Sequence, residues 1–323
     1  MPEFLQAHTL RWLEHLRRRG HPDVKPLGAG VEGAIYDLGD GTVAKIWRQR
    51  RGTELTLMQK IYADIASAGL PVATPEILAI EQVNGTAVTI ERKLPGQPLQ
   101  ARLGSDDRWL DPSAARCVVD VLRSLASVPG TASMRRVPFL DEDQSLWADA
   151  EDFGIALARL LRRRVARFGQ VIRRRLPDFD SRFAGLLDML AALDKVPDTV
   201  IHGDLVPGNI LVDEHLRPLA ILDFGFFTTA GDPRLDGAIA AAIMNMYGPH
   251  APAITDQLTA RLAADFGYSV DVLLIYQAAY AVATSNAFTP DGSDGHFAWS
   301  IAQLRRPDID AVLRPHRQAP GTH

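Results

Sequence analysis

The stretch VIHGDLVPGNILVDEHLRPLAILDFG, residues 200–225, decides the fold of this chain. Two apolar runs within it, residues 210–212 and 219–222, are too short for helices and are bounded by Gly, Pro and Asp. Runs of this kind predict a pair of buried strands, joined here at Asp213-Glu214-His215. The polar side chains between the apolar runs are therefore expected on loops at the strand ends.

Three polar side chains occupy these loops. Asp204 and Asn209 precede the first strand, and Asp223 follows the second. Moving a phosphoryl group requires a carboxylate that orients the attacking hydroxyl, and oxygen ligands that hold Mg²⁺ on the phosphates. An Asp, an Asn five residues later and an Asp-Phe-Gly fourteen residues further on agree with the protein-kinase pattern. An Asp-rich loop alone is usually a turn, but three elements in this order indicate a catalytic site.

A glycine-rich segment, LGAGVEGAIYDL at residues 27–38, is the first candidate nucleotide site. Gly28, Gly30 and Gly33 leave the backbone bare, so that its amides can approach phosphate oxygens. The same letters could open a dinucleotide-binding helix. Residues 33–47 alternate as strands, however, where that motif demands a helix.

Lys45 lies in the strand pattern TVAKIW, residues 42–47, and resembles the kinase lysine that contacts the α- and β-phosphates. The alternative is an ordinary surface lysine. Because a buried lysine needs a partner, we assign Glu54, which opens a predicted helix over residues 54–68. Its spacing from Lys45 is shorter than in protein kinases, and a plain first-turn glutamate is the alternative.

Two further strands, residues 75–81 and 86–92, complete a predicted five-stranded antiparallel sheet with one helix. The following segment, ERKLPGQPL at residues 91–99, runs into Pro and Gly and marks a domain boundary. In a kinase this hinge offers backbone groups to adenine. Glu91 and Lys93 are therefore assigned to nucleotide binding.

The fold class expected is α+β: a protein-kinase-like two-lobe fold with a small antiparallel sheet lobe plus one helix, and a large, mainly helical second lobe. After residue 99 the apolar spacing becomes helical. The predicted domains are an N-terminal helix packing on the kinase (1–20), a nucleotide-binding lobe (21–94), and a helical lobe (95–323) whose substrate-binding insert covers about 99–195.

Composition bounds the remaining possibilities. The chain has 323 residues, 46% hydrophobic, and a net charge of −4, with no apolar run long enough to span a membrane. These values favour neither nucleic-acid nor membrane binding. The single cysteine, Cys117, and the absence of an export signal indicate a cytoplasmic protein. A monomer and a homodimer are both compatible with the sequence.

Two charged segments need separate interpretation. The row of arginines over residues 159–175 could suggest nucleic acid, but a solvated helix face is the better explanation. The acidic segment, residues 141–152, either complements a helix N-terminus or forms an anionic wall for a cationic substrate. Its acidic members are Asp141, Glu142, Asp143, Asp149, Glu151 and Asp152.

Taken together, these residues resemble the aminoglycoside phosphotransferase family, kinase relatives that phosphorylate small molecules. The resemblance covers residues 27 to about 307. It rests on His202-Gly203-Asp204, Pro207-Gly208-Asn209, the segments LPGQPL (94–99) and GLPV (69–72), and Gly231-Asp232-Pro233 with Asp236.

The resemblance implies roles for individual residues. Asp204 is the catalytic base, Asn209 and Asp223 hold Mg²⁺, and Lys45 holds ATP, with GTP as a possible alternative. His202 orders the loop and is neither acid nor base. Asp236 would point back to the catalytic loop and support it by accepting backbone amides.

Two spacings favour a small acceptor over a protein substrate. Asp223 and Pro233 are ten residues apart, too few for an activation segment, and Pro95 and Asp204 are 109 apart, enough for an added helical subdomain. Phe224-Gly225 stands where many antibiotic kinases have tryptophan or an acidic residue. This departure leaves the substrate class open, because the family also includes kinases for choline, amino acids and sugars.

The sequence therefore predicts an ATP- and Mg²⁺-dependent phosphotransferase acting on a hydroxyl of a small polar molecule, with an aminoglycoside-type antibiotic as the leading acceptor. One alternative is a metabolic kinase for a sugar, an amino alcohol or an amino acid. Another is a non-catalytic, kinase-like nucleotide-binding protein. The full set of Lys45, Asp204, Asn209 and Asp223 argues against the last.

Overall fold

The computed structural model describes residues 3–30, 32–48, 50, 52–104 and 111–314. The ends of the predicted first and last domains, residues 1–2 and 315–323, lie outside this range. The chain divides into two compact units. The first comprises Met1–Gly96 and Leu219–Leu222, and the second comprises Gln97–Pro218 and Asp223–His323.

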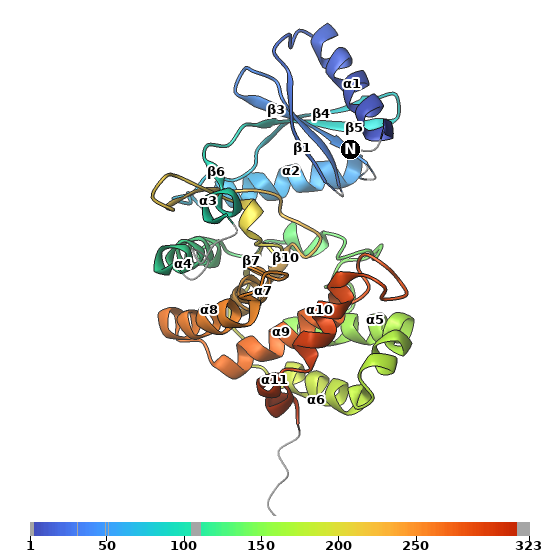
Figure 1. Ribbon diagram of the computed structural model, residues 1–323, viewed down its shortest axis with the longest axis vertical. Helices are drawn as coiled ribbons and strands as arrows, with labels where there is room; N and C mark the ends of the chain where they lie inside the picture. Colours follow the sequence, from blue (N-terminus) through green and yellow to red (C-terminus); the bar gives the residue numbers. More distant parts are fainter. Residues whose placement is uncertain (1–2, 31, 49, 51, 105–110, 315–323) are drawn as a thin grey trace, which may run out of the picture. The chain divides into compact units, whose positions relative to one another are not determined.

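The first unit is built on a five-stranded antiparallel sheet in the order β1-β2-β3-β5-β4 (Figure 1). Its strands are β1 (Lys25–Ala29), β2 (Gly33–Asp37), β3 (Thr42–Trp47), β4 (Ile77–Val83) and β5 (Thr86–Arg92). Asn84 and Gly85, between β4 and β5, both have positive φ, 51° and 79°. Such a turn matches the twist of the two strands that it joins.

Two helices accompany this sheet. Helix α2 (Gly52–Ala66) contacts β4, and its buried face consists of Leu55, Met58, Ile61, Tyr62 and Ile65. Helix α1 (Glu3–Arg18) contributes Trp12 and Leu16 to a buried cluster with Tyr36 and Ile46 of the sheet. Apolar residues at helical spacing therefore account for the packing of both helices.

The second unit is mainly helical (Figure 1). Its helices are α3 (Leu99–Leu103), α4 (Pro112–Ala126), α5 (Phe153–Arg175), α6 (Phe179–Ala191), α7 (Pro233–Ile243), α8 (Ala251–Phe266), α9 (Val270–Thr284), α10 (Gly295–Leu304) and α11 (Pro307–Leu313). Residues 273–284 of α9 are all buried, and α9 contacts α5, α6, α7, α8, α10 and α11. A helix that is apolar all round is typical of the centre of a core.

Short strands flank the loops of the second unit. Strand β7 (Thr199–Ile201) pairs antiparallel with β10 (Thr229–Gly231), and β6 (Gln97–Pro98) pairs with β8 (Ile210–Val212). The predicted strand at 219–222 is β9 (Pro218–Ile221).

The segment 219–222 belongs with the first unit, where Ala73 donates to the Leu219 carbonyl at 2.8 Å and accepts from the Ile221 amide at 2.9 Å. The α+β class is thus confirmed: a five-stranded sheet with α2 beside it and the N-terminal helix α1 packed on it, and a mainly helical remainder. Within the described ranges, no helix is both long and apolar enough to cross a membrane.

Candidate active site

The catalytic loop, residues 202–209, follows β7 in the second unit. His202 is fully buried, and its ring lies against Phe224 with the centroids 4.6 Å apart. Its Nδ1 accepts from the amide of Asp204 at 3.2 Å, while its carbonyl accepts from Thr228 Oγ1 at 3.0 Å. These contacts hold the backbone of the loop on both sides of residue 203. They are of the kind by which His202 is expected to order the loop.

Gly203 makes the tight passage between His202 and Asp204 possible. Its φ is +74°, and a Cβ at this position would lie 2.2 Å from Cβ of Phe227. Any other residue would combine left-handed backbone strain with a severe clash. The turn therefore requires glycine.

Asp236, in the first turn of α7, supports the backbone at His202 and Gly203. Its two carboxylate oxygens accept the amides of His202 and Gly203, each at 2.7 Å. The residue is only 3% exposed, and burial raises the pKa of its carboxyl to about 6, against the opposing effect of the two amide hydrogen bonds. One carboxylate thus fixes the backbone immediately before Asp204.

Asp204 and Asn209 are linked within the loop. Asn209 Nδ2 donates to the carbonyl of Asp204 at 2.9 Å. The side-chain oxygen of Asn209 therefore points away from that carbonyl. The segment after Asp223 also reaches Asp204: a Cβ at Gly225 would lie 3.5 Å from Asp204 Oδ2. The structure therefore brings together, in one unit, the loop with Asp204 and Asn209 and the segment that carries Asp223.

Asp223 adopts an unusual backbone conformation, with a φ of 45°. Residues other than glycine in this region cost about 1–3 kcal/mol and cluster at functional sites. A carboxylate from Asp223 and an amide oxygen from Asn209 are the hard oxygen donors that Mg²⁺ prefers, with phosphates and water completing its shell. The chemistry of these two side chains therefore fits the predicted metal.

The glycine-rich turn lies in the first unit, between β1 and β2. The Gly30 amide donates to the carbonyl of Gly33 at 2.8 Å. A Cβ at Gly28 or Gly30 would meet nothing within 4 Å, whereas one at Gly33 would lie 1.9 Å from the carbonyl oxygen of Ile46. Gly33 is thus needed for strand packing, and the bare backbone at 28 and 30 is compatible with the predicted approach of phosphate.

Lys45 on β3 is 5% exposed, and its Nζ lies 4.2 Å from the ring centroid of Trp47. The carboxylate beside it belongs to Glu32, with Oε2 3.5 Å from Nζ. Glu54 lies in the first turn of α2, and its pairing with Lys45 stays a prediction. The sequence reasoning overlooked Glu32, whose only signal was a carboxylate inside the glycine-rich turn.

The two assigned residues near the domain boundary make local contacts in the first unit. Glu91 Oε1 accepts from Thr89 Oγ1 at 2.6 Å. Lys93 Nζ donates to Asp37 Oδ2 at 2.6 Å, and this hydrogen bond lowers the pKa of the Asp37 carboxyl. Their assignment to nucleotide binding stays a prediction.

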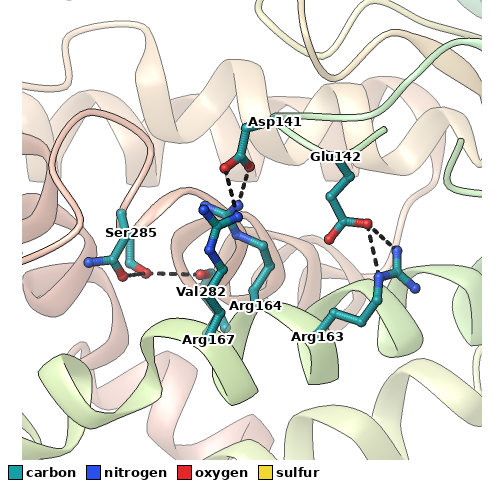
Figure 2. Close-up of polar contacts among 8 residues, drawn as sticks. Asp141, Glu142, Arg163, Arg164, Arg167, Val282 and Ser285 are labelled. Carbon is teal, nitrogen blue, oxygen red and sulfur yellow. Dashed lines mark hydrogen bonds and ion pairs between the residues drawn. The ribbon is translucent and has the colours of Figure 1, made fainter. Parts of the chain in front are cut away.

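The acidic segment is partly neutralised by arginines of α5. Figure 2 shows Asp141 against Arg164 and Arg167, and Glu142 against Arg163. The Glu142 oxygen accepts from Nε and Nη2 of Arg163 at 2.9 and 2.6 Å. Arg164 is 3% exposed, so the arginine row is not a uniformly solvated face. Two of the six carboxylates are therefore committed to these intramolecular pairs.

The end of the acidic segment caps α5. Asp152 accepts from the Ile155 amide at 3.1 Å and pairs with Lys195 Nζ at 3.1 Å. Glu151 and Asp152 also line a cavity of about 210 Å³, whose other acidic members are Asp194, Asp198 and Asp232. Helix capping is thus one role of the segment, as its position before α5 suggests.

The loop that carries Asp141 is attached to the segment after Asp223. The amide of Leu140 donates to the carbonyl of Phe226 at 2.7 Å. Because Asp141 and Glu142 follow directly in the chain, one loop is held both by the arginines of α5 and by Phe226, the residue after the Asp-Phe-Gly segment.

The fold and the catalytic loop define a kinase-like phosphotransferase. The chain belongs to the phosphotransferase enzyme family, whose model matches residues 23–270. This assignment confirms the resemblance and the predicted enzyme class. No curated protein sequence matches the chain.

Solved structures of antibiotic kinases are similar in fold. Aminoglycoside phosphotransferase APH(3'')-Id from Streptomyces rimosus ATCC10970, with ADP and streptomycin, is 20% identical; the match covers 85% of this chain and 98% of that one, with a TM-score of 0.54. The GDP and kanamycin complex of APH(2")-IIia is 16% identical, covering 92% and 98%, with a TM-score of 0.64. Macrolide 2'-phosphotransferase MphH from Brachybacterium faecium is 17% identical, covering 92% and 98%, with a TM-score of 0.55. At these identities the likeness shows the fold.

Replacing Asp236 with asparagine should lower the free energy of unfolding by about 1–3 kcal/mol, because one of two buried amides loses its acceptor. Since burial raises the pKa of Asp236 above its unfolded value, its contribution to stability is fully present below about pH 4 and is lost as pH rises through about 6. The loss of unfolding free energy caused by Asp236→Asn should therefore be larger at about pH 4.5 than at about pH 7.5.

Denaturant unfolding at the two pH values measures this difference. Asp271→Asn, which removes an exposed carboxylate from the start of α9, is the matched control and should change stability little at either pH. A deficit for Asp236→Asn that is equal at both pH values, or that grows with pH, would contradict the burial of a carboxyl with a raised pKa.

Proposed function

We propose that the protein transfers the γ-phosphoryl group of ATP, with Mg²⁺, to a hydroxyl of a small polar acceptor, and that this acceptor is an aminoglycoside-type antibiotic. GTP is the alternative donor. The observation that carries the proposal is Asp204 on a loop whose backbone is fixed by Asp236, beside Asn209 and the segment of Asp223. Membership of the phosphotransferase enzyme family supports it.

Asp204 would act mainly by positioning. The transition state of phosphoryl transfer is loose, so the attacking hydroxyl needs orientation more than nucleophilic activation. A half-buried carboxylate can accept the hydroxyl hydrogen and take the proton late. The His202 and Asp236 contacts keep the backbone at Asp204 from shifting, since small displacements of a catalytic group are costly.

Each unit, taken by itself, carries candidate groups for the nucleotide. Lys45 in the first unit supplies a cation for the α- and β-phosphates, and the bare turn at Gly28 and Gly30 supplies amides. Asn209 and Asp223 in the second unit would hold Mg²⁺, which neutralises charge on the transferring phosphoryl group when bound.

Support for an aminoglycoside comes from the family resemblance and from similar folds solved with streptomycin and kanamycin. The structure reduces the contribution expected from the acidic segment, because Asp141 and Glu142 are paired with arginines. A cationic acceptor would therefore be attracted by other carboxylates, or would have to displace these pairs.

An acceptor with an apolar face is the second candidate, favoured by an aromatic series in the second unit. Phe227, under Gly203, contacts Tyr280 at 5.1 Å between centroids, and Tyr280 contacts Trp299 at 6.1 Å. His296 continues the series and accepts a hydrogen bond from, or donates one to, Tyr247 Oη at 3.1 Å. The series ends at two exposed rings, Tyr247 and Phe288.

Asp204→Asn should reduce kcat by about 10²–10⁴-fold, the usual effect of removing a positioned base. The neutral amide is similar in size, so the dissociation constant for ATP should not change. Turnover and calorimetric nucleotide binding measure the two quantities. Retained turnover would remove Asp204 from its assigned role. The matched control is Asp213→Asn, on the exposed turn after β8, which should leave kcat unchanged.

Asp223→Ala should abolish the part of nucleotide binding that depends on Mg²⁺. Wild-type protein should gain thermal stability from Mg·ADP, by mass action, and lose most of that gain in EDTA. The variant should gain as little from Mg·ADP as the wild type does in EDTA. A variant that is stabilised by Mg·ADP as strongly as the wild type would exclude Asp223 as a metal ligand.

The acceptor is decided by measuring ATP consumption across a panel of aminoglycosides, macrolides, sugars and amino alcohols. We expect the highest kcat/KM with an aminoglycoside. A sugar or an amino alcohol as the best substrate would instead establish the metabolic kinase. Nucleotide binding without turnover on any acceptor would favour a non-catalytic protein. If an apolar acceptor is best, Phe288→Ala should raise its KM and leave the KM for ATP unchanged.

A further inference from the structure

We propose that Glu32 is a phosphate stand-in: its carboxylate occupies the phosphate position between Lys45 and Arg50, and incoming phosphate displaces it. Arg50 is then a second cation for the phosphates. The inference rests on the proposed function, since it concerns the same nucleotide. All three residues belong to the first unit, so the geometry is internal to one compact body.

The two oxygens of Glu32 are shared between two cations. Oε1 lies 2.6 Å from Nη2 of Arg50, and Oε2 lies 3.5 Å from Nζ of Lys45. Both cations also lie on Trp47, with Lys45 Nζ 4.2 Å and the Arg50 guanidinium carbon 5.3 Å from the ring centroid. A planar anion between an ammonium and a guanidinium has the charge and the hydrogen bonding of a phosphate group in such a site.

Burial explains why a carboxylate is needed here. The side chain of Lys45 is 7% exposed, and a charge so far out of water is costly without a counter-charge. The side chain of Glu32 is 33% exposed, so it can return to water at low cost. Lys45 is therefore confined to the site, whereas Glu32 can leave when another anion arrives.

The contacts of Arg50 and Glu32 also indicate that Arg50 is fixed and Glu32 can move. Arg50 is also held by α2, because its Nη1 lies 3.2 Å from Sδ of Met58. Glu32 lies in the glycine-rich turn, between the open position of Gly30 and Gly33. Exchange of Glu32 for phosphate therefore keeps both cations in place and changes only the anion.

A permanent brace is the competing explanation. In that case the Glu32–Arg50 pair would fix the shape of the glycine-rich turn, and the nucleotide would bind to the turn with the pair intact. The two explanations predict opposite effects on affinity. Loss of the Glu32 charge strengthens phosphate binding if the carboxylate must leave, and weakens it if the carboxylate shapes the site.

The test is calorimetric binding of ATP, ADP and adenosine to Glu32→Gln. We expect the dissociation constants for ATP and ADP to fall by about two- to fivefold, the range for release of a partly exposed pair. Adenosine, which has no phosphate, should bind as it does to the wild type. Glu76→Gln removes the partner of the exposed Arg92 on the same unit and is the matched control, with no change expected for any ligand.

Arg50→Gln is the second variant. It should weaken ATP and ADP binding and leave adenosine unchanged, while Arg50→Lys should restore part of the affinity. Weaker or unchanged ATP binding by Glu32→Gln would overturn the inference, and so would normal ATP binding by Arg50→Gln. If Glu32→Gln does not fold, normal ATP binding by Arg50→Gln still overturns the inference.

The wild-type measurement separates this inference from the proposed function. If wild-type protein binds neither ATP nor ADP, the proposed function fails, and the inference falls with it. If wild-type protein binds both and Glu32→Gln shows no gain, the inference alone is overturned.

Discussion

The loop that carries Asp204 depends on one buried carboxylate that accepts two backbone amides. Asp236 holds His202 and Gly203 at 2.7 Å each, directly before the residue assigned to the chemistry. Burying a charge is costly, and hydrogen bonds from two amides compensate only part of that cost, which is why the pKa of Asp236 is raised to about 6. The unit therefore gives up stability to keep this short stretch of backbone in one conformation.

The same turn shows how backbone and side chains depend on one another. Residue 203 must be glycine because its φ is positive and because Phe227 lies where a side chain would be. Phe227 in turn packs on Tyr280 of the buried helix α9. Asp204 is thus positioned by contacts that reach the core of the second unit. A catalytic group supported in this way loses little entropy when substrate binds.

Local patterns in the sequence were sufficient for the fold class and for the order of the catalytic residues. Alternation and turn residues predicted the five-stranded sheet, and the helical spacing after residue 99 predicted the mainly helical second lobe. The need for glycine at residue 185 of α6 could not be predicted in this way, because a Cβ there would lie 1.9 Å from the carbonyl oxygen of Leu313 in α11. Its packing partner is more than a hundred residues away in sequence, beyond the reach of local patterns.

The pairs that charged residues form were harder to predict from the sequence than the fold class. Glu32 reaches Lys45 because β2 and β3 are in register with Ile35 opposite Lys45, and the sequence does not specify that register. Arg164 is buried against Phe168 and Asp141, although it belongs to a run that reads as a solvated face. Such pairs depend on where whole elements meet, and they decide which charges remain available to a substrate.

The loop beginning at Leu140 has a mechanical consequence. It is attached by its amide to Phe226, three residues after Asp223, and by Asp141 and Glu142 to the middle of α5. The arginines of α5 and the segment after Asp223 are therefore joined through three consecutive residues of one loop. A neutral side chain at Arg163 or Arg164 would leave Glu142 or Asp141 without one of its cationic partners and so loosen one end of this link.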